Sequence, residues 1–334
     1  MALNRSLPVT VVIVNWNGGD LLLEALAALE RQTRPPAKVV VMDNGSRDGS
    51  AEEVARRFPA VRLRRLGANL GFSAANNLAL REEVDGDWVA LLNPDAVPEP
   101  DWLERMWQGI GDHPGYAAYG CRLRRLDNPS VLDGSGDCYH PCGWAWRRDH
   151  GIMEARGHLQ PGEIFAPCAA AALYHRRTVL ELGGFDESFF CYFEDVDLGF
   201  RLRLAGKRCF YLAGAIVNHA GSASTGRRSD FAVYHGYRNL IWCWWKNMPR
   251  SLLWRWLPAH VLFSLALLAL ALGRGQGAVA LRAQYHALLG LPRIWRQRRP
   301  ASPQETAISA MTRSWRTLWR AWRDRRIPPE SWRD

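Results

Sequence analysis

The sequence predicts an α/β fold with a mostly parallel central sheet flanked by helices, followed by a helical, basic and Trp-rich C-terminal region. Three observations support this fold class. The first 125 residues alternate apolar, β-branched runs with segments of helical periodicity, the pattern of a parallel sheet. Apolar residues make up 48% of the 334 residues, enough for a large core. Residues 246–334 carry 16 Lys and Arg against four Asp and Glu, so we divide the chain into residues 1–235 and 236–334.

The alternating elements can be assigned one by one. Val9–Val14 is an uninterrupted apolar run, typical of a strand buried on both faces. Ser50 and Glu53 have the spacing of a capping box, which predicts a helix that begins there. In chain order we expect strands at Val9–Val14, Val39–Met42, Val61–Leu66, Trp88–Leu92 and Tyr116–Leu123, and helices at Asp20–Arg31, Ser50–Phe58, Ser73–Arg81 and Pro100–Ile110.

The chain after residue 126 is less regular. Asp127–Pro161 is rich in Gly, Pro, Trp and charge without periodicity, and a loop of this length over the functional site is expected. Beyond it lies a small-residue run at Cys168–Ala172, and helical patterns follow at Thr178–Leu182 and Glu194–Ala205. Arg208–Tyr211 has the make-up of an edge strand.

The cysteines and the N-terminus indicate the compartment. The seven scattered cysteines are an odd number, which argues against a disulfide framework and fits a reducing environment. Residues 1–10 lack the apolar core of a signal peptide, so we expect the N-terminal domain to stay in the cytoplasm. Cys138 and Cys142 have no second ligand pair at zinc-finger spacing, so ordinary thiols are the simpler interpretation.

The C-terminal region has the composition of a membrane-associating segment. Trp256–Gly273 contains no Asp, Glu, Lys or Arg over 18 positions, and such a helix is about 27 Å long, the lower limit for a membrane span. Pro258 and His260 interrupt it, and a single crossing would place the Arg-rich segment Arg293–Arg326 outside, against the positive-inside rule.

We therefore expect a peripheral or re-entrant attachment to an anionic membrane, while a true span and a soluble packing or homodimer surface stay open. Near the C-terminus, tryptophans and arginines alternate at helical spacing, as in helices that lie in a membrane interface. Trp beside Arg on one face favours a lipid surface over nucleic acid as the partner of this basic region. The residues of this pattern are Trp315, Arg316, Leu318, Trp319, Arg320, Trp322 and Arg323.

Two acidic clusters about a hundred residues apart carry the chemistry. Asn93-Pro94-Asp95 closes the apolar run Trp88–Leu92, and Glu194-Asp195-Val196-Asp197 opens a helical run. A carboxylate at a strand end can hold a divalent cation against a diphosphate. A carboxylate at a helix start can accept a proton from a hydroxyl. Together they predict metal-assisted transfer from a nucleotide-activated donor.

Polar residues at the ends of other strands fit the same interpretation. Asn15 ends the first predicted strand and Asp43 the second, and the carboxyl edge of an open parallel sheet is where ligands bind. Asn69, Gly71 and Asn76 surround the start of the next helix, a suitable place for a phosphate or a sugar. Each motif alone also marks an ordinary turn; the combination in this order is far more specific.

At these residues the chain closely resembles the family 2 glycosyltransferases, especially their bacterial rhamnosyltransferase-like branch. The resemblance covers roughly residues 7–245. It implies a nucleotide-diphospho-sugar-binding (GT-A) fold and a cytoplasmic, cation-dependent, inverting sugar transfer. The matching stretches are Val14–Gly18, Asp43–Ser46, Asn69–Phe72, Leu92–Asp95, Gly183–Phe190, Glu194–Leu198, Asn218–His219 and Arg238–Asn239.

The resemblance also implies roles for single residues. Asn15 and Asp43 would contact the nucleotide base or ribose, Asp95 would hold Mg2+ or Mn2+ on the diphosphate, and Asp195 would be the base. Asn93 stands where the longer form of the family motif has Asp, as is common in the rhamnosyl branch. His219 matches a late histidine that can complete the cation shell. Further candidates are Glu194 and Asp197 beside the base, and Trp144, Trp146 and His150 for stacking on a sugar.

The expected partners follow from the same resemblance. The donor would be a dTDP- or UDP-sugar, with dTDP-rhamnose preferred, and the acceptor a glycan or a polyprenyl-linked intermediate of cell-wall or surface-glycan synthesis. The expected location is the cytoplasmic face of the bacterial inner membrane. Transfer from UDP- or GDP-hexoses, transfer to polyprenyl phosphate, a nucleotidyltransferase and a non-catalytic membrane scaffold are the alternatives. Asn-Trp-Asn-Gly-Gly after the first strand argues against a nucleotidyltransferase, which carries a Gly-rich loop with Arg and Lys there.

Overall fold

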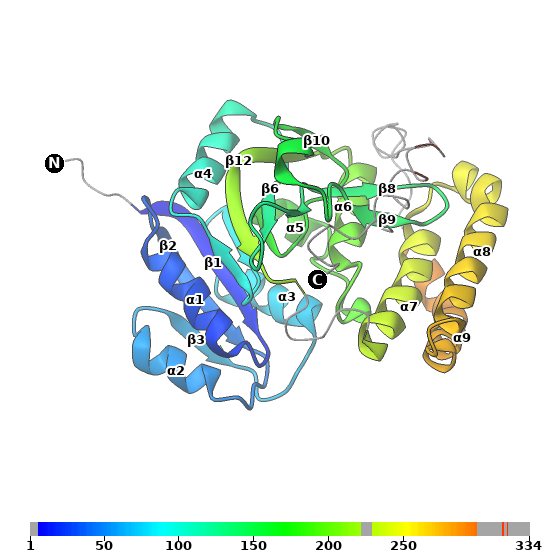
Figure 1. The fold of residues 1–334 in the computed structure, drawn as a ribbon, viewed down its shortest axis with the longest axis horizontal. Helices are drawn as coiled ribbons and strands as arrows, with labels where there is room; N and C mark the ends of the chain where they lie inside the picture. Colours follow the sequence, from blue (N-terminus) through cyan, green and yellow to red (C-terminus); the bar gives the residue numbers. More distant parts are fainter. Residues whose placement is uncertain (1–5, 222–228, 299–315, 317–318, 320–334) are drawn as a thin grey trace.

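A computed structural model describes residues 6–221, 229–298, 316 and 319. A large mixed sheet lies at its centre, with strand order β10-β12-β6-β11-β4-β1-β2-β3, and helices cover it (Figure 1). The strands β4, β1, β2 and β3 are parallel to one another. β11 is antiparallel to both β4 and β6, and β6 is parallel to β12. The mostly parallel α/β fold predicted from the sequence is confirmed.

The N-terminal half follows the predicted order closely. Its elements are β1 (Leu7–Asn15), α1 (Gly19–Glu30), β2 (Pro36–Asp43), α2 (Ser50–Arg57), β3 (Arg62–Arg65), α3 (Phe72–Glu82) and β4 (Trp88–Leu92). β1 is buried on both faces, as its apolar run predicts. Val11 and Ile13 belong to the core on one side of the sheet, and Val12 and Val14 to the core on the other.

The predicted capping box of α2 is wrong. The N-cap is Gly49, with φ +80°, and no side chain caps the helix. Ser50 is already the first helical residue; its Oγ donates to Asp48 Oδ1 at 2.6 Å and accepts from Asn15 Nδ2 at 2.9 Å. Ser50 thus joins the loop after β1 to the loop after β2. This long-range contact has no signature in the local spacing.

The middle of the chain completes the sheet. Its elements are β5 (Ala96–Pro98), α4 (Trp102–Asp112), β6 (Ala118–Arg125), β7 (Leu132–Gly134), β8 (Asp137–Tyr139), β9 (Ala145–Arg147), β10 (Gly162–Ile164), β11 (Ala171–His175), α5 (Arg176–Glu181), α6 (Glu194–Leu204) and β12 (Cys209–His219).

Two predictions for this part need correction. The segment 127–161 is not a plain loop, because it forms β7, β8 and β9, each three residues long; strands this short have no recognisable period. The predicted edge strand Arg208–Tyr211 is the start of the longer β12, which lies between β10 and β6. The register of β12 against β6 shifts between Leu212 and Ile216, where the intervening residues are small.

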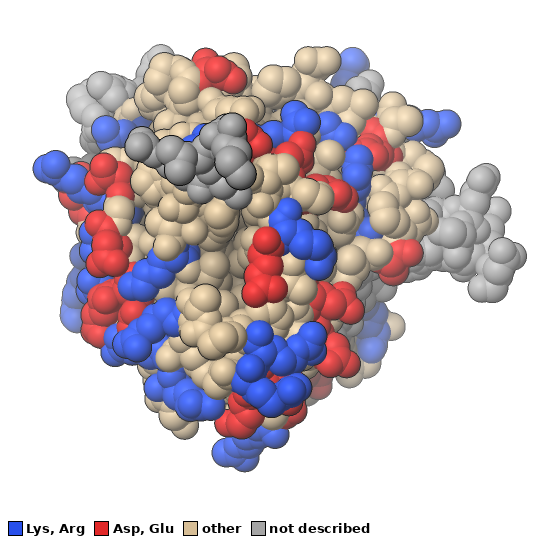
Figure 2. Space-filling model, turned by 90° about the vertical axis from the view of Figure 1, so that its left-hand side faces the viewer, with Lys and Arg blue, Asp and Glu red and all other residues tan. Residues whose placement is uncertain are grey.

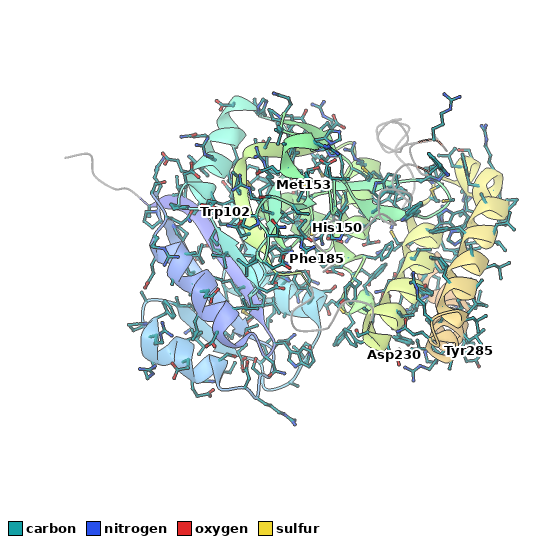
Figure 3. All side chains as sticks on the ribbon, in the orientation of Figure 1. Trp102, His150, Met153, Phe185, Asp230 and Tyr285 are labelled. Carbon is teal, nitrogen blue, oxygen red and sulfur yellow. The ribbon has the colours of Figure 1, made fainter. Side chains whose placement is uncertain are left out.

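Three helices complete the described chain: α7 (Asp230–Asn247), α8 (Arg250–Leu272) and α9 (Gly277–Arg296). They lie together on one side of the sheet domain, away from α1 and α2 (Figure 1). Tyr285 of α9 and Asp230 at the start of α7 are on this side (Figure 3). The predicted boundary between residues 235 and 236 falls inside α7.

The surfaces on the two sides of the molecule differ in polarity. On the side of α1 and α2, acidic and basic side chains are interspersed (Figure 2). On the other side, α8 is long and apolar enough to cross a membrane by length and composition, and only 11% of its most apolar window is buried. Eleven large apolar side chains of α8 and α9 are exposed: Trp254, Val261, Leu262, Leu265, Leu270, Leu272, Leu281, Tyr285, Leu288, Leu289 and Trp295.

The second expected membrane-surface helix falls mostly outside the described residues. Of its pattern the structure describes only Arg316 and Trp319, both helical and exposed. Trp315, Leu318, Arg320, Trp322 and Arg323 lie outside the described part of the chain.

Candidate active site

A cavity of about 400 Å³ opens at the carboxyl ends of β1 and β4, the edge at which open α/β sheets bind ligands. Asp95 and Asp195 both line it. Asp95 comes from the turn between β4 and β5, and Asp195 from the first turn of α6. The structure therefore brings together the two acidic clusters that are about a hundred residues apart in the chain.

Sheet pairing places His219 beside Asp95. β5 pairs with the end of β12 so that Ala96 is opposite His219, and His219 Nε2 lies 3.3 Å from Asp95 Oδ1. Asp133 of β7 accepts a 2.7 Å hydrogen bond from the other ring nitrogen, Nδ1. Burial disfavours the imidazolium, but Asp133 and Asp95 outweigh it and raise the pKa of His219 to about 9.

Asp133 is the central residue of this buried network, although it is not among the predicted site residues. It is 1% exposed and forms an ion pair with Arg147 as well as with His219. Burial alone would raise the pKa of Asp133, yet Arg147, His150 and His219 hold it well below the usual range. Asp133 is therefore ionised and fixes the ring orientation of His219.

The carboxylate of Asp195 lines the cavity and is held by two backbone amides. Its Oδ2 accepts from the Ala169 amide at 3.2 Å and its Oδ1 from the Val196 amide at 2.8 Å. Burial raises the pKa of Asp195, while these amides and the charge of Arg147 oppose the rise. Burial is the largest of these effects on the pKa of Asp195.

Glu194 shares the cavity wall with Asp195. Its Oε2 is buried and has no hydrogen-bond partner within the described residues. Burial and the charge of Asp195 raise the pKa of Glu194 well above its usual range. The two amide donors oppose the rise at Asp195, so Asp195 is the member of the pair that ionises more readily.

A strained segment leads into α6. Phe190, Tyr192 and Phe193 have φ of +67°, +66° and +69°, a conformation that costs about 1–3 kcal/mol per residue and that clusters at functional sites. The side chain of Asn239 on α7 holds this segment: its Nδ2 donates to the carbonyls of Phe189, Cys191 and Tyr192 at 2.8–2.9 Å. α7 is therefore part of the support of the catalytic helix.

Three further predicted residues, Asn69, Gly71 and Asn93, line the cavity. Gly71 has φ +86°, and a Cβ there would lie 2.6 Å from the ring of Phe190, so the close approach of the strained segment requires glycine. Asn44, which the sequence patterns do not single out, also lines the cavity and donates to Asn69 Oδ1 at 3.0 Å.

Other predicted residues lie outside the cavity lining. Asn15 is fully buried and donates to Asp43 Oδ1, Ser46 and Ser50, so it positions the loops around the site. Asp43 is buried beside it. Asn76 is buried and donates to the Phe72 carbonyl within α3.

Two more predicted residues, Asp197 and Trp144, also lie outside the cavity lining and pack elsewhere. Asp197 is on the opposite side of α6, where it forms buried ion pairs with Arg201 and Lys246. Trp144 stacks on Phe263 of α8, with ring centroids 5.8 Å apart, so it anchors the 127–161 segment to the C-terminal helices.

The 127–161 segment supplies two cavity residues that the sequence did not identify, Asp137 and Arg147, and one that it did, Trp146. Asp137 of β8 and Trp146 and Arg147 of β9 line the cavity opposite the sheet edge. The prediction that this segment lies over the site is therefore right, and Trp146 is the expected aromatic residue of the segment that lines the cavity. No local pattern marks Asp137 and Arg147, because they meet the site only through the pairing of β8 with β9.

Asp95 and His219 form a donor set that fits a divalent cation. The described residues contain no group of three or more His, Cys, Asp or Glu side chains placed for a metal ion. However, a carboxylate and an imidazole are both ligands for Mn2+ or Mg2+. The hydrogen bond from His219 Nδ1 to Asp133 is the outer contact that orients metal-binding histidines. A diphosphate would supply further oxygens.

Comparison with known proteins decides the family. The family model described as "Glycosyltransferase like family 2" matches residues 7–239. The chain belongs to this family. Over 249 residues it is 33% identical to the N-acetylglucosaminyl-diphospho-decaprenol L-rhamnosyltransferase of Mycobacterium tuberculosis, an alignment that covers 67% of this chain and 80% of the relative.

Solved structures share the fold of this glycosyltransferase. The mannosyltransferase of Pyrobaculum calidifontis in complex with GDP-Man and Mn2+ has a TM-score of 0.53 at 19% identity, over 96% of this chain and 88% of that one. GalNAc-T7 with UDP, GalNAc and Mn2+ has a TM-score of 0.57 at 14% identity, over 70% of this chain. This chain spans 47% of the length of GalNAc-T7. The expected GT-A architecture is thus confirmed at the level of the fold.

Proposed function

We propose that this glycosyltransferase moves rhamnose from dTDP-rhamnose, with inversion, to a hydroxyl of a polyprenyl-diphosphate-linked acceptor in cell-wall or surface-glycan synthesis. The observation that carries the chemistry is the shared cavity of Asp95 and Asp195. The choice of sugar and acceptor rests on the M. tuberculosis relative, whose name gives both a rhamnosyl group and a lipid-linked diphosphate.

Asp195 is the proposed general base. Its carboxylate is ionised beside the protonated Glu194 and faces the cavity, so it can accept the proton of an acceptor hydroxyl as that oxygen attacks the anomeric carbon. Direct attack from the side opposite the leaving diphosphate inverts the configuration at this carbon. The two amides that bind Asp195 keep its oxygens in place during the proton transfer.

Asp95 and His219 are the proposed ligands of Mg2+ or Mn2+. When bound, the cation would neutralise charge that develops on the departing nucleoside diphosphate. His219 is held by Asp133 so that Nε2 faces Asp95. Asn44, Asn69 and Asn93 supply amide groups along the remaining cavity wall for the donor.

The C-terminal helices are the proposed membrane attachment. The eleven exposed apolar side chains of α8 and α9 suit an acyl interface, and arginines at the helix ends would contact anionic lipid, each contributing about 1 kcal/mol. We place the catalytic domain at residues 1–235 and the attachment at 236–334, peripheral to the cytoplasmic face of the inner membrane.

A flotation experiment tests the attachment. Wild-type protein should float with phosphatidylglycerol vesicles, whereas a Leu262→Ser, Leu265→Ser, Leu289→Ser variant should remain in solution and keep its nucleotide binding. If the variant floats like the wild type, or the wild type forms a dimer that this variant breaks, the exposed surface is not a lipid surface.

A donor panel tests the function itself. Purified full-length protein should transfer sugar from dTDP-rhamnose to N-acetylglucosaminyl-diphospho-decaprenol in the presence of Mn2+, and the product linkage should show inversion. UDP- and GDP-hexoses are the comparison donors. Turnover with a UDP- or GDP-sugar alone would keep the fold and overturn the choice of sugar. If the protein neither hydrolyses nor transfers sugar from any of these donors, the proposed function is wrong.

A further inference from the structure

We propose that Arg147 is a diphosphate-binding residue of the cavity. Within the described lining of the cavity, Arg147 is the one Lys or Arg, alongside the carboxyl groups of Asp95, Asp137, Glu194 and Asp195. Its side chain is 27% exposed and lines the cavity. The inference rests on the proposed function for the chemistry of its ligand.

Charge in the cavity makes such a residue necessary. A diphosphate is a multiply charged anion, and a wall that carries several carboxyl groups repels it. One divalent cation at Asp95 offsets part of this repulsion. A guanidinium presents N–H groups in a fork that matches phosphate oxygens. Arg147 supplies this group at the wall opposite the sheet edge.

The structure holds Arg147 in one position. Its Nη1 forms an ion pair with Asp133, which is itself fixed by His219 and is 1% exposed. The aliphatic part of Arg147 lies directly over Gly134 of β7, where any Cβ would overlap its Cγ and Cδ. Gly134 has no positive φ in this structure, so contact with Arg147 is the reason for a glycine here.

The position of Arg147 is consistent with either of the two diphosphates in the reaction. Through Asp133 and His219 it is linked to Asp95, the proposed donor side of the cavity. It also lies three residues after Trp144, which packs on Phe263 of α8, on the side of the C-terminal helices where a lipid-linked acceptor would enter. The shared chemistry is a diphosphate, and the experiment separates the two sources.

The test compares Arg147→Met and Arg147→Lys with Arg148→Met as the matched control. Arg148 is the next residue, but its guanidinium donates to Ser135 and lies over Tyr211, outside the cavity lining. The donor arm measures binding of dTDP and UDP by calorimetry with saturating Mn2+, and of thymidine and uridine as ligands without phosphate. The acceptor arm measures KM for N-acetylglucosaminyl-diphospho-decaprenol.

Loss of a charge-assisted hydrogen bond to a phosphate weakens binding about 10- to 100-fold. We expect this loss in one arm for Arg147→Met, a smaller one for Arg147→Lys, and none for Arg148→Met or for the nucleosides. A loss for dTDP assigns the donor, and a raised acceptor KM with unchanged dTDP binding assigns the acceptor. Unchanged values in both arms overturn the proposal.

Two measurements exclude a merely structural role. Mn2+ affinity without nucleotide, measured by EPR, should be the same in Arg147→Lys and wild type; if it falls as much as diphosphate binding does, Arg147 acts only through Asp133 and His219, and the proposal is wrong. Gly134→Ala, which displaces Arg147 without changing it, should reproduce the loss.

Failure of the proposed function gives a different result. If the wild type transfers no sugar but Arg147→Met weakens dTDP binding, the function is wrong and the diphosphate site stands. If the wild type binds dTDP and UDP no more tightly than thymidine and uridine, both are wrong.

Discussion

The two faces of α6 carry the same side chain in different environments. Asp195 faces the cavity, accepts hydrogen bonds from two amides, and has a pKa raised by burial. Asp197, two residues later, is fully buried on the other face between Arg201, Lys246 and Asn247. Burial opposes its ionisation, but these partners lower its pKa to about 2.

The difference separates catalysis from stability within one helical turn. A carboxylate that must take up a proton during a reaction cannot also be locked in ion pairs. A carboxylate that joins two helices, in contrast, does so through such ion pairs. Lys246 and Asn247 belong to α7, so Asp197 connects the sheet domain to the C-terminal helices, while Asp195 stays available to the cavity.

Asp195→Asn tests the catalytic face. Loss of a general base lowers the rate about 10²–10⁴-fold. We expect kcat to fall in this range, while dTDP binding with Mn2+ and the free energy of unfolding stay near the wild-type values. A variant that keeps more than about a tenth of the wild-type turnover would exclude Asp195 as the base.

Asp197→Ala tests the structural face. Removing one partner of a buried ion pair costs about 3–5 kcal/mol, because Arg201 and Lys246 keep buried charge without this partner. Urea unfolding should show this loss. Asp112→Ala, at an exposed position at the end of α4, is the control and should change the free energy of unfolding by less than about 0.5 kcal/mol. A similar small change for Asp197→Ala would remove the distinction between the two faces.

Acid should separate the two aspartates in the wild type. Asp195 has a raised pKa, so its base form, and with it the activity, is lost at a pH above that at which an ordinary aspartate is protonated. The pKa of Asp197 is lowered from 3.8 to about 2, so its stabilisation of about 2 kcal/mol is present above pH 3.8 and is lost between pH 3.8 and 2.

A pH series of kcat and of urea unfolding measures both effects. We expect a range in which the protein is folded and inactive, and the stability difference between wild type and Asp197→Ala should shrink below pH 3.8. Activity that persists down to the pH of unfolding would contradict the raised pKa of Asp195.

Glu194→Gln should have the smallest effect. If Glu194 carries the proton of the pair, glutamine is close in shape and charge, and kcat at neutral pH should change by less than about tenfold. The acid limb of the pH profile should stay near its wild-type position, because a neutral Glu194 places no charge beside Asp195 and burial is what raises the pKa of Asp195. A loss as large as that of Asp195→Asn would mean that Glu194 takes part in the reaction in its ionised form.

Much of this arrangement could be predicted from the sequence. The apolar run Val9–Val14 predicted the central strand, and the carboxyl-edge rule placed the turn after β4, which carries Asp95, at the site. Asp195 followed from its position in the family pattern at the start of a helix. The opposite orientations of Asp195 and Asp197 also follow from helix geometry, since residues two positions apart are about 200° apart around the axis.

Other parts depend on contacts that no local pattern encodes. Asp133 is bonded to Arg147, 14 residues later in the chain, and to His219, 86 residues later. The strands that carry Asp133 and Arg147 are only three residues long. Asn15 looked like a ligand contact because it ends a strand. The structure shows that Asn15 is fully buried and donates to Ser46 and Ser50, so it joins the loops around the site, and its contact with the nucleotide stays a prediction.

The hydrogen bonds from Asn239 to the backbone carbonyls before α6 have a practical consequence. A polypeptide trimmed at residue 235 would keep every strand of the sheet and every acidic side chain in the cavity, yet it would lack the amide that stabilises three left-handed aromatic backbones. Such a fragment should still bind nucleotide and turn over slowly. α7, which carries Asn239, shares one buried cluster with α8 and α9, the helices with the exposed apolar side chains, so removing the C-terminal helices as a unit would also remove the support of the segment before α6.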